Sequence, residues 1–145
     1  MALDFDGVDD RSLHGDVAGI DGAADLTVMC WVNGDAITGS YAAFVSKATA
    51  ASNNSFNFGR RAADVDDVSV YFDASAGNIA TVTDGQANGT WAHWAFTYDG
   101  GGATNDDKVD MYKDGVTQSI TFGGTIPATL VYSTTGELAI GRNQR

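Results

Sequence analysis

The sequence predicts an all-β protein, folded as a two-sheet antiparallel sandwich or jelly roll. Short segments in which apolar and polar residues alternate recur along the whole chain, with turn-forming residues between them. The composition agrees, because 18 residues are glycine whereas lysine and glutamate, which favour helices, are scarce. No segment shows the 3.6-residue apolar period of an amphipathic helix.

The length of 145 residues predicts a single domain over residues 1–145. A chain of this size buries about 70% of its unfolded surface, enough for a core without cross-links. Its one cysteine, Cys30, excludes an internal disulfide. The absence of an 18-residue apolar run predicts no membrane partner, and no basic and apolar leader of a signal peptide follows Met1.

The charge of the chain is strongly acidic. Eight lysines and arginines stand against 19 acids, for a net charge of −11, and Glu137 is the only glutamate among those acids. Phosphate groups would be repelled by such a surface, and no basic stripe compensates. We therefore expect no nucleic-acid partner.

Alternating apolar residues predict six strands in the first part of the chain. In Ala2–Asp6, Leu3 and Phe5 share one face. Leu26–Val32 has the clearest pattern, because Thr27, Met29 and Trp31 share one face and the other face is wholly apolar. That second face, which we expect between the sheets, comprises Leu26, Val28, Cys30 and Val32. The later strands are Ala43–Lys47, Ser55–Arg61, Val68–Phe72 and Ile79–Thr83.

The remainder of the chain contains the strongest turn signal. Asp114-Gly115 lies between the predicted strands Lys108–Lys113 and Val116–Thr121. A type I′ turn needs positive φ at both central positions, which Asp-Gly tolerates, so we predict a β-hairpin there. The other strands are Trp91–Asp99, which directs Trp94 and Phe96 into the core, and Leu138–Gly141.

Five segments carry a family resemblance. They are Ala2–Asp10 (ALDFDGVDD), Leu26–Val32 (LTVMCWV), Gly89–Gly100 (GTWAHWAFTYDG), Val109–Gly115 (VDMYKDG) and Leu138–Arg142 (LAIGR). In this order they resemble laminin-G-like domains of the concanavalin A-like lectin/glucanase superfamily. The resemblance covers nearly the whole chain and implies two antiparallel sheets packed face to face. It does not fix a ligand, because this fold hosts lectins, adhesion modules, glycosidases and structural domains.

The resemblance has one gap. Family members continue after the Ile-Gly strand with a segment of the type Gly-x-Ile-Asp-Glu-Val, which this sequence lacks. The final family strand is then missing, replaced, or supplied by another chain. A sandwich without that strand has an unpaired edge that can template another strand. Ala2–Asp6 could fill it, giving a closed monomer. We favour a homodimer through the open edge, because Ala2–Asp6 pairs elsewhere in the family pattern.

Catalytic residues are not evident. The related glucanases carry Glu-x-Asp-x-x-Glu on one strand, and Glu137 alone cannot supply that set. Asp64 and Asp66 are a conceivable acid pair, but we interpret them as solvated loop acids. Cys30 lies on an apolar face and is expected to be inert, and His93 between two tryptophans is expected to be structural. The sequence therefore predicts that this protein is not an enzyme.

Acidic residues near the start predict a possible calcium site. Four aspartates fall within Asp4–Asp10, and calcium prefers carboxylate and carbonyl oxygens. Many laminin-G-like domains carry calcium, so the resemblance supports Ca²⁺ as a cofactor; the alternative is a solvated acidic turn. Two weaker candidates are Asp106-Asp107 and residues 64–67. The predicted metal ligands are Asp6, Asp9 and Asp10.

Sugar recognition would need an exposed aromatic ring with amides or acids nearby. Trp31 is one candidate, on the face opposite the predicted core set. The alternative, which we favour from sequence alone, is that a second packing layer or a loop covers Trp31. The complete set of predicted ligand-binding residues is Trp31, Tyr41, Asn53 and Asn54.

These features favour a non-catalytic binding module for carbohydrate or a glycosylated surface, with a carbohydrate or glycoprotein as partner. The alternative is a structural or adhesion module of a larger extracellular or virion surface protein. A polysaccharide-acting enzyme is the least favoured class. By analogy with the family, an extracellular or virion surface location is expected.

Overall fold

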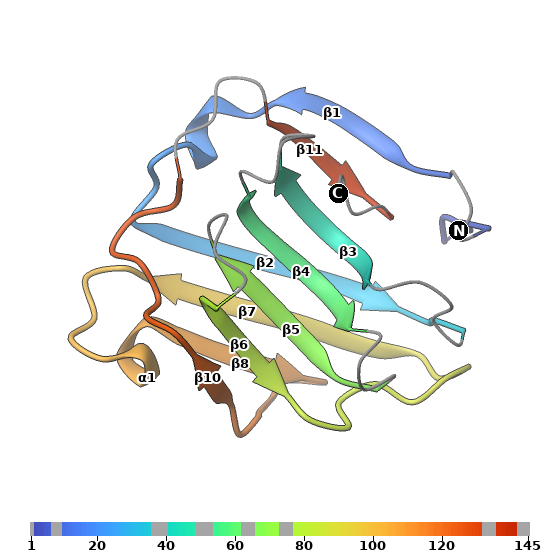
Figure 1. Cartoon of the computed structure of the whole chain (residues 1–145). Coiled ribbons are helices and arrows are strands. Elements are labelled where there is room, and N and C mark those ends of the chain that lie inside the picture. Colours follow the sequence, from blue (N-terminus) through green and yellow to red (C-terminus); the bar gives the residue numbers. More distant parts are fainter. Residues whose placement is uncertain are drawn as a thin grey trace.

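The computed structural model has the predicted fold class, an antiparallel two-sheet sandwich (Figure 1). It describes residues 2–6, 10–35, 41–48, 54–61, 66–72, 77–131 and 136–141. The strands in this part of the chain are β1 (Ser12–Asp16), β2 (Asp25–Val32), β3 (Tyr41–Ala48), β4 (Asn54–Arg61), β5 (Val68–Phe72), β6 (Ile79–Val82), β7 (Ala92–Asp99), β8 (Val109–Lys113), β9 (Val116–Thr117), β10 (Thr121–Gly123) and β11 (Glu137–Ile140).

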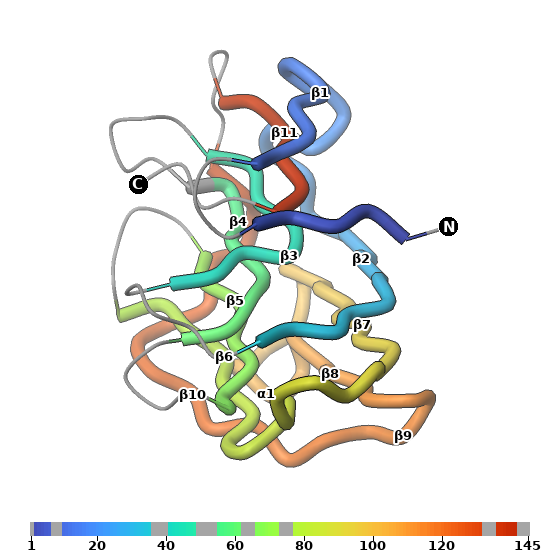
Figure 2. Tube along the Cα trace, turned by 90° about the vertical axis from the view of Figure 1, so that its right-hand side faces the viewer, coloured from blue at the N-terminus to red at the C-terminus, as the bar shows by residue number. Residues whose placement is uncertain are grey.

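Across the described residues, one sheet has seven strands in the order β1-β11-β3-β4-β5-β6-β10. The other has four strands in the order β2-β7-β8-β9. Figure 2 shows the sandwich from the side, with β4, β5 and β6 in one layer and β7, β8 and β9 in the other. Because neighbouring strands are antiparallel, each side chain lies beside a partner that points to the same face.

The core lies between the two sheets and is rich in aromatic rings. Trp94 and Phe96 of β7 are fully buried, as the alternation predicted. The ring of Phe96 lies 5.1 Å from that of Phe58 and 5.8 Å from that of Phe56, which come from the opposite sheet. Such tilted and edge-to-face pairs add to the stabilisation from burial.

The core-facing side of β2 is less well covered. The predicted set does pack against the core, but all four side chains remain half-buried. Their neighbours on β7 are fully buried, so the difference arises from the position of β2 at the edge of its sheet. The four residues are Leu26, Val28, Cys30 and Val32.

The predicted hairpin forms at Asp114-Gly115. Both residues have positive φ, 51° and 80°, as a type I′ turn requires. β8 and β9 pair on either side of the turn. The predicted strand Val116–Thr121 is wrong in its length, because β9 ends at Thr117 and β10 begins at Thr121 in the other sheet.

The N-terminal prediction is also wrong. Ala2–Asp6 belongs to neither sheet, and β1 lies further along the chain, over Ser12–Asp16. Leu3 is exposed, and the ring of Phe5 lies against Gly141, whose φ of +82° is a conformation that suits glycine. Ala2–Asp6 therefore does not fill the open edge as a strand.

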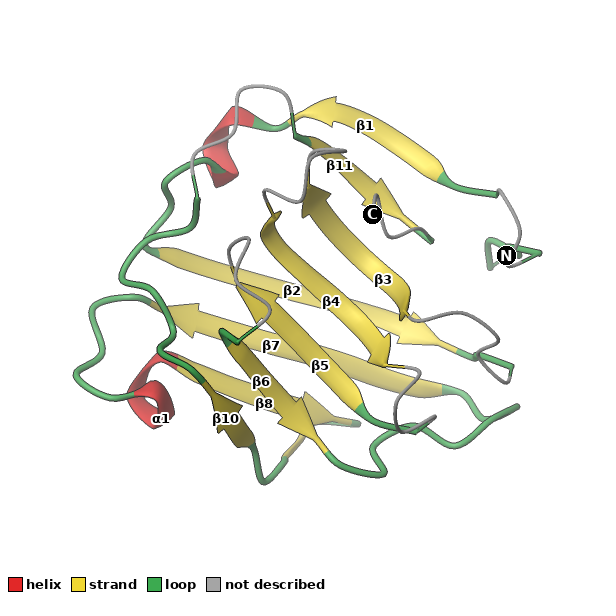
Figure 3. Cartoon of the chain, viewed as in Figure 1, coloured by secondary structure: helices red, strands yellow, loops and turns green. Residues whose placement is uncertain are grey.

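Helix is nearly absent from the described residues, as predicted (Figure 3). The two short helices are η1, a 3₁₀ turn over Ala18–Ile20, and α1, over Asn105–Lys108. Thr104 and Asp107 cap α1 reciprocally, because the Asp107 amide donates to the Thr104 hydroxyl. The Thr104 hydroxyl and backbone N–H donate to the Asp107 carboxylate and lower its pKa. None of the described helices is long and apolar enough to cross a membrane.

A buried ion cluster fastens β1 and η1 to β3. The Lys47 ammonium has no exposed surface and donates to Asp16 at 2.8 Å and to Asp21 at 2.6 Å. Burial alone would lower the pKa of Lys47, but the hydrogen bonds and charges of the two carboxylates outweigh it and raise that pKa. The cluster explains how a lysine side chain can be fully buried on β3.

Candidate functional site

The outer face of the four-stranded sheet exposes large apolar side chains on regular strands. Met29 is 62% exposed and Trp31 is 66% exposed, because they alternate along β2 with the core-facing set. Isolated exposed apolar residues are ordinary, but a contiguous group indicates an interaction surface. We define the outer face by Thr27, Met29, Trp31, His93, Ala95, Thr97, Asp110, Tyr112 and Thr117.

The strand register places these residues in rows across the sheet. Trp31 lies opposite His93, and their ring centroids are 5.3 Å apart with planes tilted by 56°. The next row runs from Met29 through Ala95 to Tyr112. The small side chain of Ala95 lies between the larger side chains of Met29 and Tyr112, which therefore project further from the sheet. Rows of this kind are the ordinary consequence of cross-strand pairing.

Polar residues border the apolar rows. One row further along, Thr27, Thr97 and Asp110 lie side by side. At the other end, the Asp114 carboxylate accepts a hydrogen bond from the His93 backbone at 2.8 Å, and the Asp114 amide donates to the His93 carbonyl. The hairpin turn thereby holds the strand that presents His93. The outer face thus combines exposed rings with carboxylates and hydroxyls.

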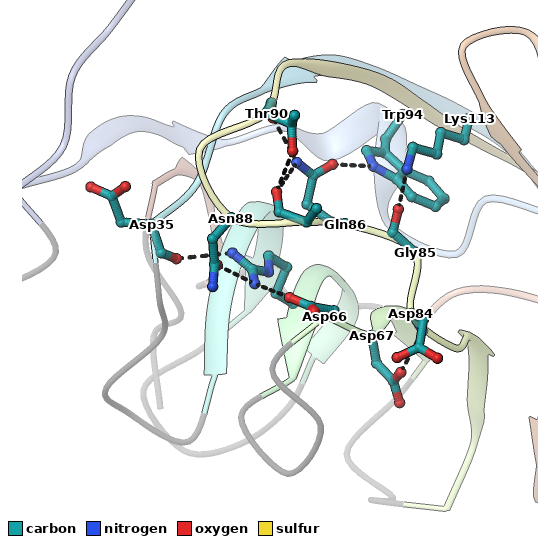
Figure 4. A network of polar contacts seen from close by, with 12 residues as sticks. Asp35, Asp66, Asp67, Asp84, Gly85, Gln86, Asn88, Thr90, Trp94 and Lys113 are labelled. Carbon is teal, nitrogen blue, oxygen red and sulfur yellow. Dashed lines mark hydrogen bonds and ion pairs between the residues drawn. The ribbon is translucent and has the colours of Figure 1, made fainter.

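Polar contacts at the end of the sandwich hold the chain that leads into β7 (Figure 4). The Gln86 side chain is buried, accepts from the Trp94 indole at 2.8 Å and donates to the carbonyls of Ala87 and Thr90. The Lys113 ammonium, 5.8 Å above the Trp94 ring, donates to the Gly85 carbonyl at 2.6 Å. These bonds attach the segment before β7 to Trp94 of β7 and to Lys113 of β8.

A buried arginine organises the neighbouring loops. Arg60 donates to the backbone carbonyl of Asp35, to the Asp66 carboxylate and to the Asn88 amide oxygen, all within 3.0 Å. Asp67 accepts from the backbone of Asp84. Asp66 and Asp67 are therefore used in structural hydrogen bonds, which weakens residues 64–67 as a calcium candidate. Asp64 lies outside the described residues. In the other weak calcium candidate, Asp106-Asp107, the Asp107 carboxylate is likewise used, because it caps α1.

The structure separates the predicted sugar ligands. Trp31 is exposed on the outer face, so the favoured interpretation that a second packing layer or a loop covers it is wrong. Tyr41 lies in the other sheet, where its hydroxyl donates to the Asn57 carbonyl and its ring packs edge-on against Tyr71. Asn53 and the side chain of Asn54 lie outside what the structure describes. Trp31 and Tyr41 therefore do not share a site.

The predicted metal ligands are only partly described. The backbone of Asp6 donates to the Asp10 carboxylate at 3.2 Å, so those two residues do lie close together. Asp9 lies outside the described residues. Within the described part of the chain, no three acidic, histidine or cysteine side chains gather closely enough to hold a metal ion. The described residues do not by themselves fit calcium, and the site stays a prediction.

Cys30 should be unreactive in the folded protein. Burial raises the pKa of its thiol from 9.0 to about 12, so at pH 8 the reactive thiolate is about a thousandfold rarer than in a free thiol. We expect alkylation by iodoacetamide at pH 8 to be slow in the native protein and rapid in concentrated urea. Equal rates in the two conditions would contradict this.

Sequence reasoning missed most of the outer face. Alternation along one strand identifies Met29 and Trp31 as sharing a face, but His93 and Tyr112 join them only through the pairing of β2, β7 and β8. That pairing depends on which strands become neighbours, and local periodicity carries no such information. The sequence holds one signal for His93: residues of β7 alternate between the two faces, so His93 must point away from the core if Trp94 is buried.

Comparisons with known proteins agree with this architecture. The family model described as "Concanavalin A-like lectin/glucanases superfamily" matches residues 6–145. The chain is similar in structure to the native heptameric SAP-like pentraxin from Limulus polyphemus, with a TM-score of 0.58 and 14% sequence identity. The match covers 90% of this chain and 55% of that chain, so this chain spans little more than half its length. No curated protein matches the sequence.

Proposed function

Because the chain belongs to the concanavalin A-like lectin/glucanases superfamily, we propose that it is a non-catalytic module that binds carbohydrate on the outer face. The observation that carries the proposal is the exposure of Trp31 on a regular strand, beside His93. The apolar face of a sugar ring stacks on such an indole, and removing both surfaces from water favours binding.

The polar border supports hydrogen bonding to a stacked sugar. Hydroxyls of Thr27 and Thr97 can donate or accept, and the carboxylate of Asp110 accepts. Only a few well-placed polar groups are needed to orient a ligand on an apolar floor. Because β2, β7 and β8 pair here without a bulge, the face suits an extended saccharide that lies across several strands.

Electrostatics favour neutral or cationic saccharides. The chain carries a net charge of −11, and Asp25, Asp99, Asp110 and Asp114 are all exposed on the four-stranded sheet or its turns. Sulfated or carboxylated saccharides would be repelled by this field. The ligand class that we propose is therefore a neutral glycan of a cell surface or matrix.

A non-catalytic role fits the placement of the single glutamate. Glu137 begins β11, which lies in the seven-stranded sheet and not on the outer face. The usual pair of carboxylates flanking a scissile sugar bond would have to come from aspartates alone. Calcium bound by Asp6, Asp9 and Asp10, and an extracellular location, belong to the same proposal and rest on the family.

An adhesion module that recognises protein is the second candidate. The observation that favours it is the exposure of Met29 and Trp91 in addition to Trp31. Exposed methionine and aromatic side chains of this kind are also typical of surfaces that bind another protein. The two candidates differ in what the ligand must carry: a glycan in the first case, a polypeptide in the second.

Replacing Trp31 by alanine should weaken glycan binding at least about tenfold. The reason is that loss of one stacked ring costs about 1.4 kcal/mol or more. We would screen the protein on an array of neutral and sulfated glycans, in calcium and in EDTA, and measure the best neutral ligand by calorimetry. Leu3→Ala is the matched control, because Leu3 is equally exposed but lies outside the outer face.

The outcomes separate the candidates. Binding of neutral glycans that is weakened in Trp31→Ala and kept in Leu3→Ala supports the proposal. An array without any ligand, or binding that is unchanged in Trp31→Ala, contradicts it and favours the adhesion module. Loss of binding in EDTA would show that calcium takes part.

A further inference from the structure

One sheet edge differs from the others in the described part of the chain. The edge strands are β1 and β10 in one sheet and β2 and β9 in the other. β9 has two residues, β10 has three, and β1 pairs with an irregular register. β2 has eight residues and pairs with β7 at every position without a bulge. It is the only long, regular edge among them.

The sequence of β2 lacks the usual protection of an exposed edge. Proteins prevent unwanted strand addition with lysine, proline, bulges or very short strands at their edges. β2 contains neither lysine nor proline, and its single charged residue, Asp25, stands at its first position. In an antiparallel pair alternate residues direct their N–H and C=O groups away from the partner strand, so every second residue of β2 presents its backbone groups on the side away from β7.

The core beneath this edge is incompletely covered. The inward side chains of β2 are half-buried, whereas the inward side chains of β7 next to them are fully buried. Ala2–Asp6, which the sequence predicts as a strand, forms none and so adds no strand to this edge. An added strand would complete the backbone pairing and remove the apolar side chains from water. The inward side chains are Leu26, Val28, Cys30 and Val32.

We propose that the occupant is β2 of a second copy, paired antiparallel about a two-fold axis perpendicular to the sheet. Inward residues must then face inward residues, which a pairing centred on Met29 achieves. Leu26 lies opposite Val32 of the partner subunit, and Val28 opposite Cys30 of the partner subunit. The two four-stranded sheets become one continuous sheet.

The strand is complementary to itself in this register. Asp25 falls opposite Asn33 of the partner subunit, so no two acids face one another across the new pair. The overall charge of −11 on each copy still opposes association at long range. Salt screens that repulsion over about 8 Å at physiological ionic strength, so the dimer should strengthen with added salt.

Light scattering after size exclusion tests the proposal on the whole chain. We expect a mass that rises from 15.1 kDa toward twice that value with protein concentration and with sodium chloride. Met29→Lys places two ammonium groups opposite each other at the two-fold axis, and should lower the association constant at least about tenfold. Met29 is exposed, so the variant should fold, which circular dichroism verifies.

Val116→Lys is the matched control, because Val116 is equally exposed but lies on β9, at the opposite edge of the same sheet. It should dimerise as the parent does. Hydrogen exchange supplies a second readout: the β2 amides that point away from β7 should become protected as concentration rises.

Three results would overturn the proposal. The first is a constant mass of 15.1 kDa with rapidly exchanging edge amides up to millimolar concentration. The second is a dimer that survives Met29→Lys while those amides still exchange, which would place the contact elsewhere. The third is edge amides that are protected at every concentration in a monomer, which would show that the chain itself covers the edge.

Discussion

Replacing Lys47 by methionine should lower the free energy of unfolding by about 3–5 kcal/mol. Methionine matches the volume of the buried stem but removes the ammonium that both carboxylates contact. Asp21, whose side chain is almost completely buried, would then be left as a buried charge beside Asp16. Urea unfolding followed by circular dichroism measures the loss.

Two controls define the cause of that loss. Arg61→Met removes an exposed cation from the next strand and should change stability by less than about 0.5 kcal/mol. The double variant Lys47→Met with Asp21→Asn should be more stable than Lys47→Met alone, because the uncompensated charge is gone. A double variant no better than the single one would contradict an electrostatic origin.

The raised pKa of Lys47 also sets the direction of the pH effect. The folded protein holds this proton more tightly than the unfolded chain does, so the cluster contributes fully below the ordinary value of 10.5. The contribution is lost as pH rises through the folded-state pKa. Stability should therefore fall above pH 10.5, and the fall should be smaller in Lys47→Met.

Replacing Phe96 by alanine should cost about 3–5 kcal/mol, because it opens a cavity at the centre of the core. Phe96 is fully buried, and its ring contacts three phenylalanine rings of the opposite sheet. Chemical denaturation checks the loss, since the midpoint should fall with little change in slope.

Phe96→Leu and Val116→Ala are the comparisons for that experiment. Leucine keeps much of the buried volume, so it should lose less than half as much as alanine does. Val116 is exposed, and its truncation should be nearly neutral. A loss under about 1 kcal/mol in Phe96→Ala would mean that Phe96 is not the centre of the packing.

The sequence predicts the central strands well because their alternation is local. β2, β5 and β7 each carry an apolar set on one face, and their observed limits lie within a residue of the predicted ones. β1 escaped prediction because Ser12–Asp16 has one apolar side chain and a glycine. It is a strand only because β11 is there to pair with it. Ala2–Asp6 has the better pattern but does not pair with any strand among the described residues.

The site was harder to predict than the fold. Alternation identifies Trp31 as opposite to the core, but it does not say whether anything covers that side. His93 reads as a structural residue from its neighbours, and only the cross-strand register brings its ring to Trp31. The prediction that Tyr41 binds the same ligand as Trp31 is wrong for a similar reason. Tyr41 lies on β3, which belongs to the other sheet, and local sequence does not show this. Contacts between distant segments decide sites of this kind.

The pairing of β1 with β11 has a consequence for the order of folding. These strands lie side by side in the sheet although they come from opposite ends of the described chain. Closing so long a loop is entropically costly, whereas the β4-β5-β6 meander and the β7-β8 hairpin join neighbours in sequence. We expect the meander and the hairpin to form the nucleus, and β1 and β11 to join it last. The lysine that holds β1 then acts after the rate-limiting step, slowing unfolding far more than it speeds folding.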